Sequence, residues 1–356
     1  MKYTIFGESH GPAIGIVIDD VPAGTVLDMD LVSSQMSRRA PGKNPLGTSR
    51  SEADRPEFLS GVLVGDDGAI TATGAPLCVS IPNGNTRSQD YDKLRKLPRP
   101  SHSDYAASVR YGGYNDVRGG GHFSGRLTAP LVFAGALAEQ LLREKGVGLA
   151  AKISRIGRVS DTPTDYANPD MAALAALRNN VLPVSNPSAA QAMELEILTA
   201  KEAGDSVGGT VTCYLTGVPA GIGAPDLGQN VEGVFAQHLF AIPAVRTVEF
   251  GAGALLSMLR GSQGNDAFYM ENGMVKTKTN YSGGVNGGIT NGMPLVFTVY
   301  FRPTPSIGLA QETVNLETGE NETFAIEGRH DPCIVQRAVP AVEAAAALAL
   351  CELWDM

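Results

Sequence analysis

The sequence predicts one domain of the mixed α/β or α+β class, covering residues 1–356. Helix-like and strand-like stretches intermix irregularly, and several strands follow one another directly, which a regular βαβ repeat would not give. Hydrophobic residues make up 43% of the chain and charged residues 18%, so there is enough apolar surface for a large core. No linker, low-complexity tract or short-period repeat divides the chain.

Short apolar runs predict four strands in the first third, at 3–6, 14–19, 58–64 and 69–81, with a turn at 65–68. A helix is predicted over 31–39, with Asp28 or Asp30 as its N-cap. Two basic stretches that contain Pro and Gly, 38–47 and 83–101, are predicted to be loops.

The remaining chain mixes both element types. Helices are predicted at 129–145, 170–179, 188–203, 230–241 and 339–352, with Ser188 as the N-cap of the third. Strands are predicted at 152–159, 208–216, 243–250 and 295–301. Glycine clusters at 261–264 and 283–288 indicate loops.

A glycine-rich stretch, 118–128, reads Arg-Gly-Gly-Gly-His-Phe-Ser-Gly-Arg-Leu-Thr and precedes the apolar helix. Three consecutive glycines allow a sharp turn and a close approach to a ligand. His122 and Ser124 add hydrogen-bonding groups, and Arg126 adds charge. The stretch is either an anion site or an ordinary turn before a core helix. It matches neither the P-loop nor the dinucleotide fingerprint.

Four of the five histidines lie in predicted loops beside Gly, Pro or Arg: His10, His102, His122 and His330. A loop histidine is more often a surface residue than a catalytic one, but four such settings favour an acid–base site. His238 falls in a predicted helix and is interpreted as structural.

The segment 7–11 also satisfies G-x-S-x-G, the nucleophile elbow of serine hydrolases, with Ser9 as the nucleophile. The elbow requires a strand before it and a helix after it, whereas a strand-like run follows here. A hydrolase is therefore the weaker hypothesis. Arginines in or beside the loops instead suggest a polyanionic small ligand: Arg38, Arg39, Arg50, Arg99, Arg126 and Arg329.

Other classes of function are disfavoured. The net charge of −9 argues against nonspecific nucleic-acid binding. The most apolar windows are too short to span a bilayer, and the N-terminus lacks a signal-peptide core, so we expect no membrane partner. The four cysteines form no C-x-x-C pair, which is typical of reduced thiols in the cytoplasm. Histidine spacing predicts no metal site.

Taken together, the motifs resemble the chorismate synthase family. They are Gly7-Glu-Ser-His-Gly11, Arg99-Pro-Ser-His-Ser-Asp104, the Arg-Gly-Gly-Gly of 118–121 and the Gly-Arg-His-Asp-Pro-Cys of 328–333, with further matches at 201–209, 242–245, 249–251, 283–289 and 340–344. Each is weak alone, but they occur in family order over essentially the whole chain.

The resemblance implies a β-α-β sandwich fold and a homotetramer in the cytoplasm. The implied reaction is a 1,4-anti elimination of phosphate from 5-enolpyruvylshikimate 3-phosphate to give chorismate, with reduced FMN and no net redox change. By the same resemblance His10 would contact the reduced flavin, His102 would be the acid that assists phosphate departure, and Asp331 would help the flavin accept the ring proton.

The resemblance also implies binding residues. The substrate residues would be Ser9, Arg39, Lys43, Arg50, Arg99, Arg126 and Arg329. The flavin residues would be His122, Phe123, Ser124, Pro243, Ala244, Gly287, Arg302, Pro303, Thr304, Pro305, Ser306 and Arg329. Arg302 would address the flavin phosphate, where most relatives carry lysine. The family is also associated with FAD, and its bifunctional members reduce their flavin with NADPH.

The chain departs from the family pattern in its loops. His122 replaces an arginine, Leu127 replaces a glutamate, and Ser101 replaces a common glycine. Two basic positions align with Pro45 and Ser51, where Lys43 or Arg50 would have to substitute. A relative that binds flavin or anions without turnover is therefore a second hypothesis.

Overall fold

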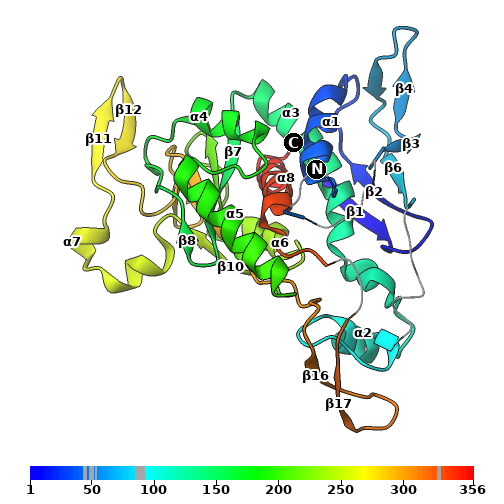
Figure 1. Ribbon diagram of the computed structural model, residues 1–356. Coiled ribbons are helices and arrows are strands. Elements are labelled where there is room, and N and C mark those ends of the chain that lie inside the picture. Colours follow the sequence, from blue (N-terminus) through cyan, green and yellow to red (C-terminus); the bar gives the residue numbers. More distant parts are fainter. Residues whose placement is uncertain (43–45, 48–51, 53, 85–92, 327–329) are drawn as a thin grey trace.

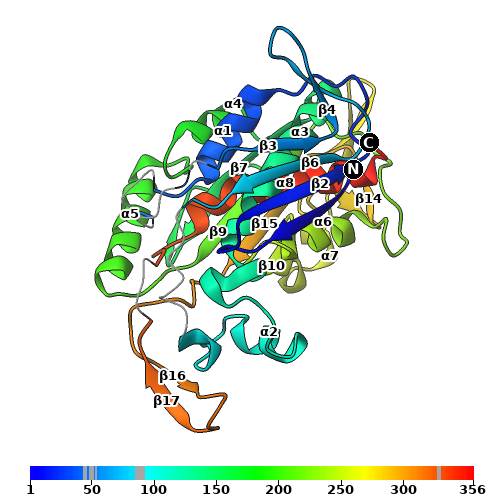
Figure 2. The same ribbon diagram turned by 90° about the vertical axis from the view of Figure 1, so that its right-hand side faces the viewer.

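Two antiparallel sheets enclose a layer of helices in the computed structural model, which describes residues 1–356 except 43–45, 48–51, 53, 85–92 and 327–329 (Figures 1 and 2). The first sheet has the order β1 (Lys2–Gly7), β2 (Ala13–Asp19), β6 (Leu77–Pro82), β3 (Glu57–Ser60). The second has the order β10 (Val245–Phe250), β15 (Leu295–Phe301), β9 (Gly209–Thr216), β7 (Gly148–Ile156), β8 (Val159–Ser160).

The central helices are α3 (Thr128–Glu144) and α8 (Val335–Leu353), flanked by α1 (Met29–Arg39) and α6 (Val231–Phe240). The α3 helix packs on β2 and β6, α8 packs on β7 and β9, and the two helices pack on each other. Both are apolar on most sides because each is covered by a sheet and by neighbouring helices. The result is the β-α-β sandwich implied by the resemblance.

Close contact between the central helices depends on small side chains. A β-carbon at Gly135 of α3 would lie 2.1 Å from the Cβ of Ala344 in α8, so only glycine fits there. The alanine-rich sequence of α8 thus allows the two helix axes to approach closely. The α8 helix begins at Val335, earlier than the predicted 339, and continues through Pro340 because surrounding packing holds it helical.

Most predicted elements are confirmed, with corrections at the glycines. The predicted strand 58–64 is divided into β3 and β4 (Val62–Val64) at Gly61, which has a φ of 82°. The predicted strand 152–159 is divided in the same way at Gly157. A positive φ breaks the extended conformation of a strand. The predicted strand 69–81 becomes β5 (Ile70–Ala72) and β6.

The helices α4 (Met171–Ala176) and α5 (Pro187–Glu202) lie within or near their predicted ranges. Asp28 caps α1 as predicted, but α5 is capped by Asn186 and not by Ser188. The Asn186 side chain accepts hydrogen bonds from the backbone N–H groups of Ser188 and Ala189, because it precedes the Pro187 that opens the helix.

Several small elements were not predicted: α2 (Asp104–Arg110), α7 (Gly261–Gly264), and the hairpins β11–β12 (Phe268–Glu271, Met274–Thr277), β13–β14 (Val285–Asn286, Ile289–Thr290) and β16–β17 (Gln311–Val314, Asn321–Phe324). The β11–β12 and β16–β17 hairpins project from the sandwich (Figure 1). All four cysteines are free. Along the described part of the chain, no helix is long and apolar enough to cross a membrane.

Both ends of the chain meet beside α6. His238 is buried, with Nδ1 3.1 Å from the Tyr3 hydroxyl and Nε2 2.8 Å from a Glu352 carboxylate oxygen. These contacts join β1, α6 and α8, which agrees with the structural role expected of this histidine.

Candidate active site

Two predicted histidines lie against the glycine-rich stretch. Gly119, Gly120 and Gly121 all have a positive φ, at 59°, 85° and 53°. A β-carbon at Gly119 would lie 2.2 Å from His10 Nδ1, and one at Gly120 would lie 3.4 Å from His102 Nε2. The glycines therefore let the backbone pass close to both imidazole rings, which come from segments about ninety residues apart.

The turn between β1 and β2 is fixed to the same glycines. The Ser9 backbone N–H donates to the Gly121 carbonyl at 3.1 Å, and His122 Nδ1 lies 2.9 Å from the Gly7 carbonyl. Ser9 is fully buried, and its hydroxyl has no hydrogen-bond partner among the described residues. Because β2 and not a helix follows Ser9, the nucleophile-elbow hypothesis is wrong.

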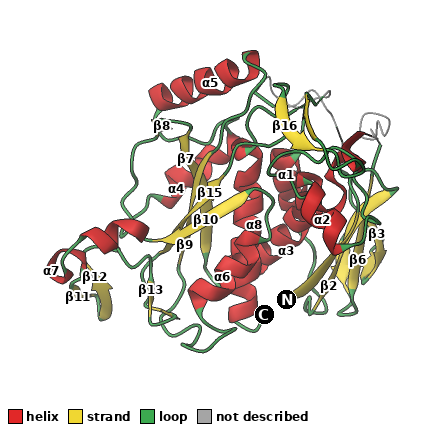
Figure 3. Cartoon of the chain, turned by 90° about the horizontal axis from the view of Figure 1, so that it is seen from below, coloured by secondary structure: helices red, strands yellow, loops and turns green. Residues whose placement is uncertain are grey.

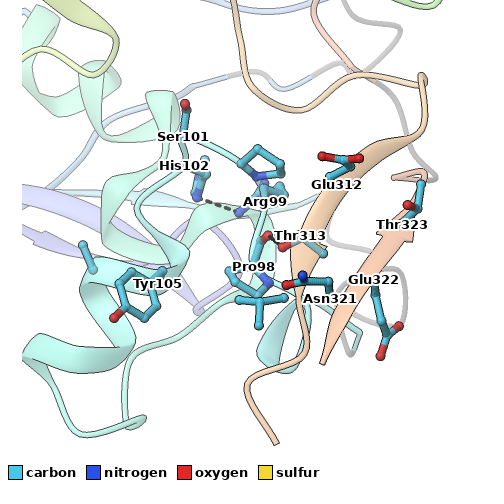
Figure 4. A pocket seen from close by; sticks show the side chains of 13 residues that line it. Pro98, Arg99, Ser101, His102, Tyr105, Glu312, Thr313, Asn321, Glu322 and Thr323 are labelled. Atoms are coloured by element: carbon cyan, nitrogen blue, oxygen red, sulfur yellow. Dashed lines mark hydrogen bonds between the residues drawn. The ribbon is translucent and has the colours of Figure 1, made fainter. Parts of the chain in front are cut away.

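His102 belongs to a buried group with Asp104 and Arg99. Its Nδ1 lies 2.7 Å from an Asp104 carboxylate oxygen, and Arg99 donates to both oxygens of that carboxylate at 2.7 and 2.8 Å. A carboxylate only accepts hydrogen bonds, so Nδ1 carries a proton and Nε2 is the titrating atom. Figure 4 shows the contact between His102 and Arg99.

Burial lowers the pKa of His102 below its ordinary value, and the hydrogen bond to Asp104 opposes this only in part. Burial alone would raise the pKa of Asp104, but hydrogen bonds from Arg99 and His102 outweigh it and hold that pKa well below its usual range. Without a ligand, the group is therefore a neutral imidazole on an ionised carboxylate at neutral pH.

The segment after β15 lies against this group. Arg99 Nη1 donates to the Ser306 hydroxyl at 3.0 Å, and the Thr304 hydroxyl donates to the Asp331 carbonyl at 3.0 Å. The Arg302 backbone N–H donates to the Ala244 carbonyl at 3.0 Å, and Ala244 has a φ of 74°. The residues predicted to bind flavin, 243–244 and 302–306, therefore lie near His102 and Asp331.

Asp331 is held by a residue that was not predicted. Arg337 in α8 donates to both carboxylate oxygens of Asp331, at 2.8 and 3.0 Å. The same guanidinium donates through Nε to the Arg39 carbonyl at 3.2 Å. Arg337 therefore connects the Asp331 segment to the end of α1.

Arg39 and Arg126 form a second buried group with two carboxylates. Asp54 pairs with both arginines, and Glu52 pairs with Arg126 at 2.6 Å. Burial lowers the pKa of Arg39 to about 10, although Asp54 opposes the shift. Burial would raise the pKa of Asp54, but the two arginines outweigh it and lower that pKa, so the carboxylate is ionised.

Asn83 connects this second group to the turn that carries His10. Its side-chain oxygen accepts a hydrogen bond from Arg126 Nε at 3.0 Å, and its Nδ2 donates to the carbonyls of Glu8 and Gly11 at 3.0 and 2.9 Å. Asn83, Arg337 and the Asp54 bridge thus join the predicted residues of four separate segments into one site.

Some predicted residues are not brought to this site. Gly287 is exposed in the β13–β14 hairpin, which lies away from α2 within one chain (Figures 2 and 3). Phe123 is 38% exposed, near the ring of Tyr111. Lys43, Arg50 and Arg329, and the aligned positions Pro45 and Ser51, lie outside the described residues.

A cavity of about 720 Å³ lies beside His102, between residues 98–106 and the β16–β17 hairpin (Figure 4). Arg99 and His102 form part of its wall, but Glu312 and Glu322 line the hairpin side. Two carboxylates disfavour a polyanionic ligand. We therefore expect the substrate on the glycine side of His102, not in this cavity.

The residues missed by sequence reasoning are Asp104, Asp54, Asn83 and Arg337. Only Asp104 had a usable signal, since a carboxylate two positions after a loop histidine can orient the ring. Asp54 and Asn83 contact residues at least 15 positions away, and Arg337 contacts the Arg39 carbonyl 298 positions away as well as the nearer Asp331. No local pattern indicates the distant contacts.

Comparison with known proteins gave consistent matches. The family model described as chorismate synthase matches residues 1–354. The chorismate synthase of Thermococcus kodakarensis is 43% identical over 352 residues, covering 99% of this chain and 95% of the relative. That of Methanocella arvoryzae is 44% identical over 349 residues, covering 98% and 91%. A crystal structure of chorismate synthase shares the fold, with a TM-score of 0.75, 24% identity, and coverage of 99% of this chain and 90% of that chain.

Proposed function

The chain belongs to the chorismate synthase family, and from this premise we propose that it eliminates phosphate from 5-enolpyruvylshikimate 3-phosphate to form chorismate. The reaction is a 1,4-anti elimination that uses reduced FMN without net redox change, the last common step toward the aromatic amino acids. Family membership itself makes the protein a lyase of aromatic amino acid biosynthesis.

The observation that supports the proposal is the close approach of two histidines, His10 and His102, to neighbouring glycines of one turn. Elimination requires a group that assists the leaving phosphate and a group that supports removal of a ring proton. His102, backed by Asp104, suits the first role because its Nε2 faces the glycine turn. Asp331, oriented by Arg337, suits the second.

His102 needs a second proton before it can act as an acid. Its pKa is lowered by burial in the free protein, but a phosphate dianion near Nε2 would favour the protonated ring. Substrate binding would then supply the charge that makes His102 an acid at neutral pH. The fixed Nδ1–H contact with Asp104 would keep Nε2 directed at the phosphate.

The described residues fit a flavin. The Ser9 hydroxyl is buried without a hydrogen-bond partner among the described residues, so a polar group of a bound ring would satisfy it. Arg302, Thr304 and Ser306 offer donors for a phosphate chain or ring edge. Bound reduced FMN would supply an electron-rich ring that promotes loss of phosphate. His10 would hydrogen-bond that ring, and His122 to Ser124 would cover its edge.

We propose three further properties on the basis of family membership. The protein would be a homotetramer, in which Gly287 could meet a site formed by another chain. Its free cysteines support a cytoplasmic location. In this proposal the flavin is supplied to the protein already reduced.

An anaerobic assay tests the reaction. The protein is mixed with chemically reduced FMN and 5-enolpyruvylshikimate 3-phosphate, and chorismate absorbance and phosphate release are followed together. We expect both to rise, and neither to rise without reduced flavin. Flavin binding with no product would refute the proposal and favour a binding protein that has lost turnover.

A further inference from the structure

We propose that the Asp54 carboxylate is an internal counter-anion, which occupies an oxyanion site between Arg39 and Arg126 and is replaced by an anionic group of the ligand. The proposal rests on the proposed function only for the identity of that ligand. The ligand chemistry is a phosphate or a carboxylate.

One carboxylate bridges the two guanidinium groups. Arg39 Nη1 contacts one oxygen of Asp54, and Arg126 Nη1 contacts the other. Arg39 comes from the last turn of α1, while Arg126 comes from the 3₁₀ turn Gly125–Leu127 that precedes α3. Two arginines from different elements therefore converge on one anion, as they would on a bound phosphate or carboxylate.

Burial makes an anion necessary at this position. Arg39 is 1% exposed, Asp54 4% and Arg126 5%. Two cations removed from water are costly unless a negative group lies between them. In the described arrangement Asp54 supplies that group, with Glu52 as a second partner of Arg126.

The remaining contacts of the arginines fix them in place independently of Asp54. Arg39 Nε donates to the Thr128 hydroxyl at 3.1 Å, and Arg126 Nε donates to the Asn83 side chain at 3.0 Å. The two Nη1 groups that face Asp54 are therefore pre-oriented donors. A ligand can use this pair of donors only by taking the place of the carboxylate.

The anion position lies within the candidate active site. Asn83 links Arg126 to the turn that carries Ser9 and His10, and Arg337 links the Arg39 backbone to Asp331. An anionic group of the substrate held between the two arginines would thus be placed beside the groups proposed for catalysis.

The test is phosphate binding to Asp54→Asn in the absence of flavin and substrate. Calorimetry and thermal unfolding are measured with inorganic phosphate. We expect the variant to unfold at a lower temperature than the wild type without phosphate and to recover with it. Its apparent affinity for phosphate should exceed that of the wild type by about tenfold or more, because phosphate no longer competes with a carboxylate. Acetate in a parallel titration distinguishes a phosphate from a carboxylate preference.

Asp161→Asn is the matched control. Asp161 pairs with Lys152 at a distance of 2.8 Å, and Lys152 is 1% exposed. In the described part of the chain, neither residue pairs with Arg39 or Arg126. That variant should also lose stability, without gaining phosphate affinity. Equal phosphate affinity in wild type and Asp54→Asn would overturn the proposal and make Asp54 a permanent structural partner.

If Asp54→Asn does not fold even in phosphate, Glu52→Gln decides the question. It leaves the bridge intact but removes the second carboxylate on Arg126. We expect a smaller increase in phosphate affinity, and no increase would overturn the proposal. Because no step needs turnover, a failed elimination assay would leave this result unaffected.

Discussion

Protonation of His102 is controlled by residues that are close in sequence and buried together. Arg99, His102 and Asp104 lie within six positions, and the turn before α2 brings their polar atoms within 3.1 Å of one another. The carboxylate fixes the tautomer, while burial disfavours the charged ring. The His102 ring is thus neutral in the free protein at neutral pH, and we expect it to gain a proton when an anion binds.

We predict that His102 titrates below 6.5, its ordinary value, in the free protein. A negative ligand favours the protonated ring, so the pKa should rise on substrate binding, and affinity should weaken as pH rises through the pKa of the complex. The measurement is ¹H–¹⁵N NMR of the five histidine rings, with His102→Gln for assignment. A free-protein pKa above 6.5, or no rise on binding, would contradict the assignment.

At the scale of elements, the glycine turn decides how close the two histidines come. Gly119 is the tightest point, because its φ is 59° and a β-carbon would lie 2.2 Å from His10 Nδ1. Gly125, six positions later, has open space at its β-carbon position and an ordinary φ. The two glycines of one loop are therefore not equivalent.

Gly119→Ala should displace His10 and lower turnover by about a hundredfold, while cooperative unfolding is retained. Gly125→Ala, whose β-carbon would meet no atom within 4 Å, should leave turnover unchanged. Steady-state kinetics under anaerobic conditions, with circular dichroism as the folding control, make the comparison. Equal activity of the two variants would show that the approach of His10 to the turn is not needed.

At the scale of the molecule, the helical layer contains a buried network of charges. Glu343 of α8 pairs with Arg38 of α1 and with Arg178, which also pairs with Glu139 of α3. Burial would raise the pKa of Glu343, but the two arginines outweigh it and lower that pKa. The network joins three helices of the sandwich and lies one residue from Arg39.

Glu343→Ala would leave Arg38 and Arg178 with fewer partners in a dry environment. We expect it to lower the free energy of unfolding by about 3–5 kcal/mol, as measured by guanidinium denaturation. Glu317→Ala, which removes the exposed pair with Lys96, should change stability little. A loss no larger than that of the surface variant would mean that the network contributes only to specificity.

Elements with local signals could be predicted from the amino-acid sequence. Apolar runs predicted β1, β2, α3 and most of α8, and the consecutive glycines predicted the sharp turn at 119–121. Loop positions singled out His10 and His102, and the ordered motifs indicated the family. These features depend on neighbouring residues, so they can be read along the chain.

The pairing of buried charges became known only from the fold. Three sets of contacts join segments that no sequence periodicity relates. They are those of Asp54 with Arg39 and Arg126, of Asn83 with the His10 turn, and of Arg337 with Asp331. The strand breaks at Gly61 and Gly157 also depended on sheet geometry. The physical reason is that burial and pairing of charges are set by packing between distant segments, whereas local propensity sets only the elements.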